Sequence, residues 1–129
     1  MGQGFFRVSY FQDLSQVEIE EEVKAEIEKQ IQEETVVIYS KDYCPYCMLT
    51  KHLLSSNNVT NITVREINLE REKGLMIQAI LFRITGQKSV PDIFIAGKHI
   101  GGNSELQGLT KSGKLKTILD DAGIANNFS

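Results

Sequence analysis

Residues 35–54 read TVVIYSKDYCPYCMLTKHLL and hold the clearest structural signals of the chain. Residues 35–39 are a run of β-branched and aromatic residues, which is typical of a buried strand. Residues 48–54 contain good helix formers, and Leu49 and Leu53 lie four apart, on one helix face. Pro45 suits the first helical position, because the N–H that proline lacks would be unpaired there. The stretch therefore predicts a strand, a short loop and a helix that begins at the first cysteine.

The chain has only two cysteines, and Cys44 and Cys47 are three positions apart at the predicted helix start. Cys44 is expected at the N-cap, where it faces the free N–H groups and the positive end of the helix dipole. Both effects favour a thiolate, and Lys41 adds a nearby cation. Cys47 lies one turn further in, within disulfide reach but shielded. We therefore predict a redox pair in which Cys44 attacks and Cys47 resolves.

Two structural alternatives compete with a redox pair. A zinc site needs about four ligands, and beyond the cysteines only His52 and His99 remain, without paired spacing, so no metal is expected. An inert disulfide would close so short a loop that it removes little chain entropy. The redox interpretation is favoured over both.

Length and composition limit the other classes of function. A chain of 129 residues that is 41% hydrophobic suits one domain with a real core. No run reaches the roughly 18 apolar residues of a membrane span, and no secretory signal is apparent. The net charge of −3 argues against a nucleic-acid binder. It combines an acidic segment over residues 1–34, with a net charge of −6, and a remainder with a net charge of +3.

Further elements follow from periodicity and from capping residues. Ser15 and Glu18 form a capping box, which predicts an acidic helix over about 16–33. Residues 1–14 are expected to be a flexible N-terminal tail, and residues 15–129 a single domain. Beyond residue 54 we expect strands over 61–69, 93–95 and 99–100, and helices over 70–85, 104–111 and 114–122.

Four short motifs, in order and at compatible spacing, give the chain a resemblance to a known family. They are Lys41 after the first strand, Cys44-Pro45-Tyr46-Cys47, Ser89-Val90-Pro91 and Gly101-Gly102. Over about residues 30–124 the chain resembles the dithiol glutaredoxins. The resemblance implies a thioredoxin-like α/β fold, with a four-stranded mixed sheet in the order 2-1-3-4 and helices on both faces. The acidic N-terminal helix would be an addition to this fold.

The resemblance also implies a site for glutathione as co-substrate. Lys41 would meet the glycine carboxylate with help from Gln78, and Tyr46 would line the groove. Pro91, which could otherwise be an ordinary proline at a strand start, would be cis and leave the Val90 backbone free to pair with glutathione. The γ-glutamyl carboxylate would bind at a helix start formed by Gly102, Asn103 and Ser104. Similar proteins usually have threonine in place of Ser89, and the group that meets the ammonium is open because Glu105 follows.

The resulting functional hypothesis is a glutathione-dependent thiol–disulfide oxidoreductase that reduces protein–glutathione mixed disulfides and protein disulfides. One alternative is a thioredoxin, although those proteins usually have a tryptophan before the cysteine pair and this chain has none. The other is an iron–sulfur cluster carrier that uses Cys44 and glutathione, which, by the resemblance to dithiol relatives, Pro45 disfavours.

We expect glutathione and glutathionylated or disulfide-containing proteins as partners, with no nucleic acid and no membrane. A monomer is expected. Because two cysteines in redox use suit a reducing compartment, the expected location is the cytoplasm, with an organellar presequence in residues 1–14 as the alternative.

Overall fold

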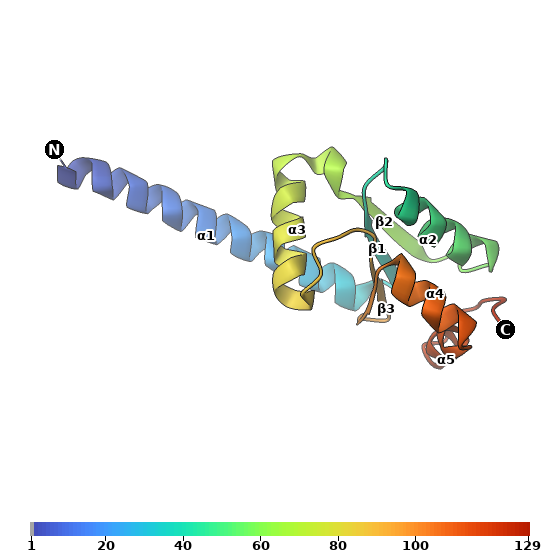
Figure 1. Cartoon of the computed structure of the whole chain (residues 1–129). Coiled ribbons are helices and arrows are strands. Elements are labelled where there is room, and N and C mark those ends of the chain that lie inside the picture. The colour runs from blue at the N-terminus through green and yellow to red at the C-terminus, as the bar shows by residue number, and fades with distance from the viewer. Residues whose placement is uncertain (1) are drawn as a thin grey trace.

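A four-stranded sheet in the order β2-β1-β3-β4 forms the centre of the fold (Figure 1). The computed structural model describes the backbone of residues 2–129 and the side chains of residues 15–129. Strand β1 (Val36–Ser40) is parallel to β2 (Ile62–Glu66) and antiparallel to β3 (Asp92–Ile95). Strand β3 also pairs antiparallel with β4 (Lys98–Gly101). The predicted order 2-1-3-4 is therefore confirmed.

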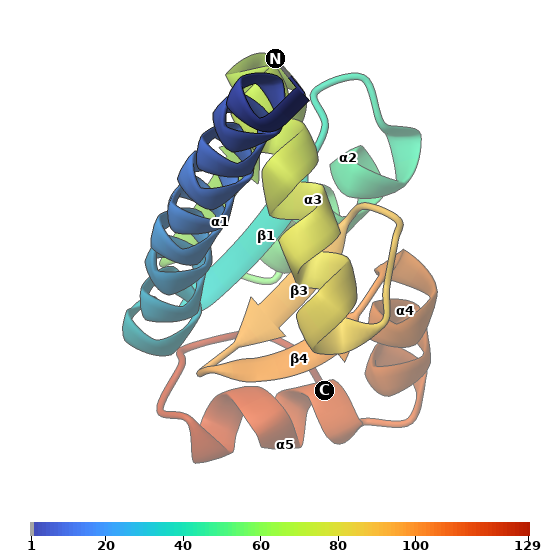
Figure 2. The same ribbon diagram turned by 90° about the vertical axis from the view of Figure 1, so that its left-hand side faces the viewer.

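The central strand is apolar on both faces because helices cover both sides of the sheet. Val36 and Ile38 pack in the core with α2 (Pro45–Ser56), α4 (Asn103–Lys111) and α5 (Lys114–Asp121). Val37 and Tyr39 pack in the opposite core with α1 (Gly2–Glu33) and α3 (Glu72–Thr85). Figure 2 shows α1 and α3 side by side over the sheet. Successive side chains of a strand point to opposite faces of the sheet, and helices cover both faces here. Residues 35–39 are therefore a continuous run of buried residues rather than an alternating pattern.

The helix α1 is longer than the sequence predicts. Its backbone begins at Gly2, so the predicted start near residue 16 is wrong, and Ser15 and Glu18 lie inside the helix. The chain has no proline before Pro45, so nothing in this segment forces a helix to end there. The flexibility of residues 1–14 stays a prediction, because their side chains lie outside the described part of the chain. None of the described helices is long and apolar enough to span a bilayer.

The predicted second strand ends early, at Glu66, and a short 3₁₀ helix η1 (Ile67–Glu70) follows. Pairing with β1 stops at Ser40 and Glu66. Beyond that point Asn68 bonds Asp42 instead: its Oδ1 accepts the Asp42 N–H at 3.0 Å, and its Nδ2 donates to Asp42 Oδ1 at 2.8 Å. Side-chain bonding thus replaces the strand ladder where the chain leaves the sheet.

A close approach of α3 to η1 requires glycine at position 74. A Cβ atom at Gly74 would lie 1.8 Å from the Ile67 carbonyl oxygen, so no larger residue fits without moving the backbone. This approach brings the N-terminal turn of α3 close to the end of β1, where Lys41 begins the loop to the cysteines.

Candidate active site

Cys44 is the N-cap of α2, as predicted, and Pro45 occupies the first turn. The Cys44 Sγ accepts a hydrogen bond from the Cys47 N–H at 3.2 Å. The thiol also donates to the Val90 carbonyl oxygen at 3.7 Å. Cys44 is half-buried, so its sulfur combines access to solvent with the field of a helix N-terminus.

Cys47 has a different environment from Cys44, although the two residues share one helical turn. Its side chain is fully buried. Burial raises the pKa of the Cys47 thiol to about 11, and the hydrogen bond with the Cys44 side chain adds to this rise. Cys47 therefore stays protonated near neutral pH. The structure supports the predicted asymmetry, with one accessible sulfur and one shielded sulfur.

A groove of about 750 Å³ is lined by Val90, whose carbonyl oxygen contacts the Cys44 thiol, and by Tyr46 of the same helical turn. The Val90–Pro91 peptide bond is cis, as predicted, and both residues line the groove. Six of the predicted glutathione-binding residues meet there: Tyr46, Val90, Pro91, Gly102, Asn103 and Ser104. They come from α2, from the segment before β3 and from the start of α4, so the fold brings together residues that are far apart in sequence.

The start of α4 is shaped for a negatively charged group. Gly101 has a φ of 117°, a conformation that L residues rarely adopt. Gly102 donates its N–H to Glu105 Oε2 at 3.0 Å, so this amide is occupied. The next amides, of Asn103 and Ser104, have no partner within the helix and can receive a carboxylate. Glu105 lines the same groove and supplies a negative charge suited to an ammonium group.

Lys41 and Gln78 lie in a second hollow, of about 200 Å³, and not in the larger groove. The Gln78 Nε2 donates to the Lys88 carbonyl oxygen at 2.8 Å, so this amide also holds the loop after α3. Cys44 links the two hollows, because its N–H donates to the Lys41 carbonyl oxygen at 3.0 Å while its thiol contacts Val90.

Two further residues of the site were missed in the sequence. Arg71 lines the hollow of Lys41 and adds a second cation there. It follows η1 in an unusual backbone conformation (φ 56°), which no local pattern predicts. Thr50 is fully buried in α2, and its hydroxyl donates to Asn103 Oδ1 at 3.1 Å, which ties α2 to the start of α4. The sequence signal for this contact was a polar threonine on the otherwise apolar face of α2, which indicates a buried hydrogen-bond partner.

A buried acid–base pair lies behind the groove. Asp92 follows Pro91, is 1% exposed, and its Oδ1 lies 2.6 Å from His99 Nε2. Its Oδ2 is buried and has no hydrogen-bond partner among the described residues. Burial raises the pKa of Asp92 to about 6, while the hydrogen bond from His99 opposes the rise. Among the side chains of residues 15–129, no three His, Cys, Asp or Glu groups converge as metal ligands.

The Asp92 carboxyl should make the stability of the protein depend on pH. A raised pKa means that the folded chain holds this proton to a higher pH than the unfolded chain. The stability that the protein has with Asp92 protonated is fully present below about pH 4, and it is lost as the pH rises through about 6. We therefore expect Asp92→Asn to gain up to about 3 kcal/mol in unfolding free energy relative to wild type between pH 4 and pH 7. Urea unfolding of both proteins at several pH values would measure this gain.

The exposed Asp121→Asn variant is the control for this measurement, because it removes an acid without changing a buried group. A pH-independent difference between Asp92→Asn and wild type would contradict the assignment.

The fold and the Cys44–Cys47 site together define a thiol–disulfide oxidoreductase with a thioredoxin-like architecture. The sequence model of the glutaredoxin family matches residues 36–100, half of the chain. The chain belongs to the glutaredoxin family.

Named relatives and a solved structure agree with this assignment. Glutaredoxin-C2 of Arabidopsis thaliana is 42% identical over 94 residues, which cover 72% of this chain and 82% of the relative. The chloroplastic Glutaredoxin-C5 of the same plant is 40% identical over 103 residues, 80% of this chain but only 59% of that relative. The buckwheat glutaredoxin–glutathione complex superposes with a TM-score of 0.77 at 32% identity, and the match covers 82% of this chain and 94% of the other.

Proposed function

We propose that this glutaredoxin reduces protein–glutathione mixed disulfides and protein disulfides, with Cys44 as nucleophile and Cys47 as resolving thiol. The observation that carries the proposal is the contrast between the two sulfurs. Cys44 is accessible at the N-terminus of α2 and contacts Val90, whereas Cys47 is fully buried one turn further along the helix.

The exchange steps balance in sulfur, electrons and protons. The Cys44 thiolate attacks the glutathione sulfur of a mixed disulfide, so a new S–S bond forms and the substrate protein leaves as a thiolate that takes up a proton. A second glutathione, as thiolate, attacks the Cys44–glutathione disulfide, releases glutathione disulfide and restores Cys44. With a protein disulfide, the Cys44 thiolate breaks the substrate S–S bond, forms a mixed disulfide with one substrate sulfur and releases the other as a thiolate that takes up a proton. Cys47 then loses its proton and attacks the Cys44 sulfur, so the second substrate sulfur leaves and is protonated, and a Cys44–Cys47 disulfide forms. Two glutathione molecules reduce this disulfide and leave as one glutathione disulfide.

Glutathione has two carboxylates and one ammonium, and the two hollows offer complementary groups. We assign the glycine carboxylate to Lys41, Gln78 and Arg71, which share the smaller hollow. The γ-glutamyl carboxylate is assigned to the amides of Asn103 and Ser104, and its ammonium to Glu105. The buckwheat relative was solved in complex with glutathione, which supports a glutathione site in this fold.

A pair of coupled assays tests the choice of reductant. NADPH oxidation with glutathione, glutathione reductase and a small mixed disulfide should depend on the protein. With thioredoxin reductase in place of glutathione and its reductase, we expect at least about tenfold slower turnover of the same substrate, because that reductase must recognise a protein surface rather than a tripeptide. Comparable or faster turnover with thioredoxin reductase would reverse the assignment in favour of a thioredoxin-type reductant. A cytoplasmic location and a monomeric state stay predictions.

A further inference from the structure

The helix α2 runs back along β1 and places Cys47 over the end of that strand. It connects β1 to its parallel neighbour β2, so it points in the opposite direction to both. Near its C-terminal end Leu54 packs with Val36 and Ile38 of β1. Ser40 is on the same face of β1 as these two residues, because side chains alternate along a strand. Cys47, about two turns before Leu54, therefore lies over Ser40.

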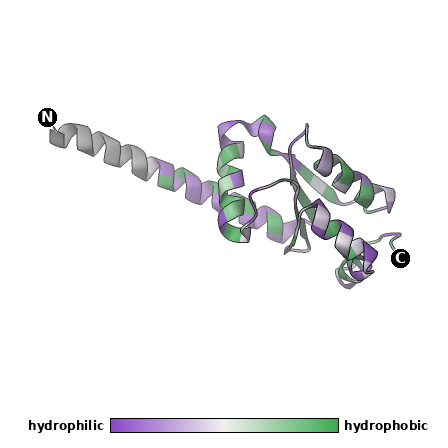
Figure 3. Cartoon of the chain, viewed as in Figure 1, coloured by the Kyte–Doolittle hydropathy of each residue, from purple (hydrophilic) through white to green (hydrophobic). Residues whose placement is uncertain are grey.

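The described side chains include three buried polar residues, Ser40, Thr50 and Asp92. Asp92 pairs with Tyr39 of β1, whose side chain packs with α1 and α3, so the Asp92 carboxyl lies on the face of the sheet away from α2. Thr50 donates its hydroxyl proton to the start of α4 at 3.1 Å. Ser40 is the one of the three that can donate to Cys47. Figure 3 shows hydrophobic and hydrophilic residues in turn along α2, as expected for a helix with one face on the sheet.

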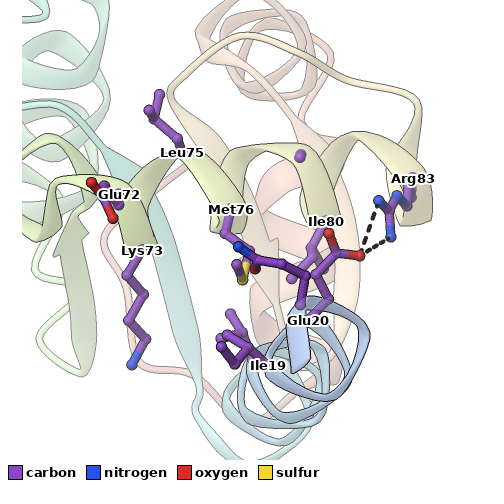
Figure 4. Close-up of a pocket in the computed structure, with 11 residues that line it drawn as sticks. Ile19, Glu20, Glu72, Lys73, Leu75, Met76, Ile80 and Arg83 are labelled. Atoms are coloured by element: carbon purple, nitrogen blue, oxygen red, sulfur yellow. Dashed lines mark hydrogen bonds and ion pairs between the residues drawn. The ribbon is translucent and has the colours of Figure 1, made fainter. Parts of the chain in front are cut away.

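The face of the sheet away from α2 is covered by α1 and α3. The groove between these helices has a volume of about 640 Å³ and is lined by their residues alone. Figure 4 shows Ile19 of α1 near Met76 of α3, beside the Glu20–Arg83 ion pair. A group that acts on Cys47 must therefore come from the α2 side of the sheet.

Two hydrogen bonds favour the thiolate of Cys47. One comes from the Ser40 side chain and the other from the Lys41 backbone, and each lowers the pKa of Cys47. Burial and the hydrogen bond with Cys44 outweigh them in the resting protein and hold the pKa at about 11. The Ser40 hydroxyl also lies 3.4 Å from the Lys41 carbonyl oxygen, a long contact from which its proton can rotate toward the sulfur.

This balance changes once Cys44 carries a substrate. Its sulfur is then part of a disulfide rather than a thiolate, so it attracts the Cys47 proton less strongly. Burial still opposes a charge on Cys47. Ser40 is fully buried, as Cys47 is, so its hydroxyl can donate to that charge where water has little access. A hydrogen bond to a charged group is strongest in such surroundings.

We propose that the Ser40 hydroxyl stabilises the Cys47 thiolate during the resolving step by donating a hydrogen bond to its sulfur. Cys47 gives its proton to water and attacks the Cys44 sulfur, so the Cys44–Cys47 bond forms and the bond from Cys44 to the substrate breaks. The substrate sulfur leaves as a thiolate and takes up a proton from water, while Ser40 keeps its own proton. The inference rests on the proposed function and adds a catalytic residue to the step that protein disulfides require.

Single-turnover kinetics of Ser40→Ala would test the inference with the full-length chain. Reduced protein is mixed with two copies of a short peptide joined by one disulfide, and acid-quenched samples are analysed by mass spectrometry. A peptide adduct on Cys44 forms first and then decays to the Cys44–Cys47 disulfide. We expect adduct formation to stay within about twofold of wild type. Adduct decay should slow about tenfold or more, which corresponds to the loss of one hydrogen bond to a charged group.

Ser55→Ala is the matched control for this variant. It removes an exposed hydroxyl from the same helix, where Ser55 donates to the His52 carbonyl oxygen at 3.3 Å and lies two turns beyond Cys47. Both steps should keep their wild-type rates in this variant. Thermal unfolding of the two variants checks that the fold is kept, and the rate of adduct formation checks Cys44 itself.

Cysteine–glutathione mixed disulfide separates this inference from the proposed function, because its reduction needs Cys44 and a second glutathione but not Cys47. Failure of the wild type to reduce it, or a peptide adduct on Cys47 instead of Cys44, would refute the proposed function. If the wild type reduces it, the inference is overturned by adduct decay in Ser40→Ala that is as fast as in wild type. It is also overturned if adduct formation slows as much as adduct decay.

Discussion

The Cys44→Ser variant should lose the reduction of glutathione mixed disulfides, with a fall in kcat/KM of roughly three orders of magnitude. A serine hydroxyl at the N-cap of α2 still accepts the Cys47 N–H, so the fold is expected to remain. The serine hydroxyl is not ionised near neutral pH, however, and cannot act as the nucleophile in disulfide exchange. NADPH oxidation coupled through glutathione reductase measures the loss, and circular dichroism checks the fold.

Cys47→Ser is the matched comparison, because it removes the other sulfur of the same turn. Reduction of a mixed disulfide needs only Cys44 and a second glutathione, so this variant should keep within about threefold of wild-type activity. It should lose most of its activity on protein disulfides, where Cys47 releases the substrate. Equal losses in both variants on the mixed disulfide would contradict the assignment of Cys44 as nucleophile and Cys47 as resolving thiol.

Lys41→Glu should raise the KM for glutathione-containing substrates by about 10- to 100-fold. A hydrogen bond to a charged group contributes about 1.5–3 kcal/mol, and the new carboxylate would also repel the glycine carboxylate. Lys41 is half-buried beside Arg71, so part of this attraction is shielded from salt. We expect kcat to change less than KM, because Lys41 does not contact the sulfurs.

Lys29→Glu is the control for this charge reversal, since Lys29 is exposed on α1 and does not line the hollow of Lys41. Steady-state kinetics at two salt concentrations, with thermal unfolding as a check of stability, would measure the effect. Unchanged KM values in Lys41→Glu would remove Lys41 from the glutathione site.

Local patterns in the sequence predicted the elements that depend on near neighbours. Cys44 at the N-cap, Pro45 in the first turn and Gly86 at the end of α3 are all as expected. Each is set by contacts within a turn or two, so the chemistry of a few consecutive residues is enough. The cis bond at Pro91 was expected from the resemblance to the family, and not from local sequence.

The length of α1 shows where local signals are ambiguous. Ser15 and Glu18 have the spacing of a capping box, yet the same residues are compatible with the interior of a helix that begins at Gly2. A capping pattern indicates only that a helix can begin at a given residue. Whether the helix begins there depends on whether the preceding residues are themselves helical.

The sequence of this glutaredoxin was enough to predict the order of helices and strands and the position of the two cysteines at the start of a helix. Only the tertiary structure brought Arg71 to Lys41, Thr50 to Asn103 and the acidic α1 to the exposed face of α3. The physical reason is the range of the forces involved. Capping and periodicity act within a few residues, whereas a hollow depends on how separate helices pack on the sheet, which no single segment encodes.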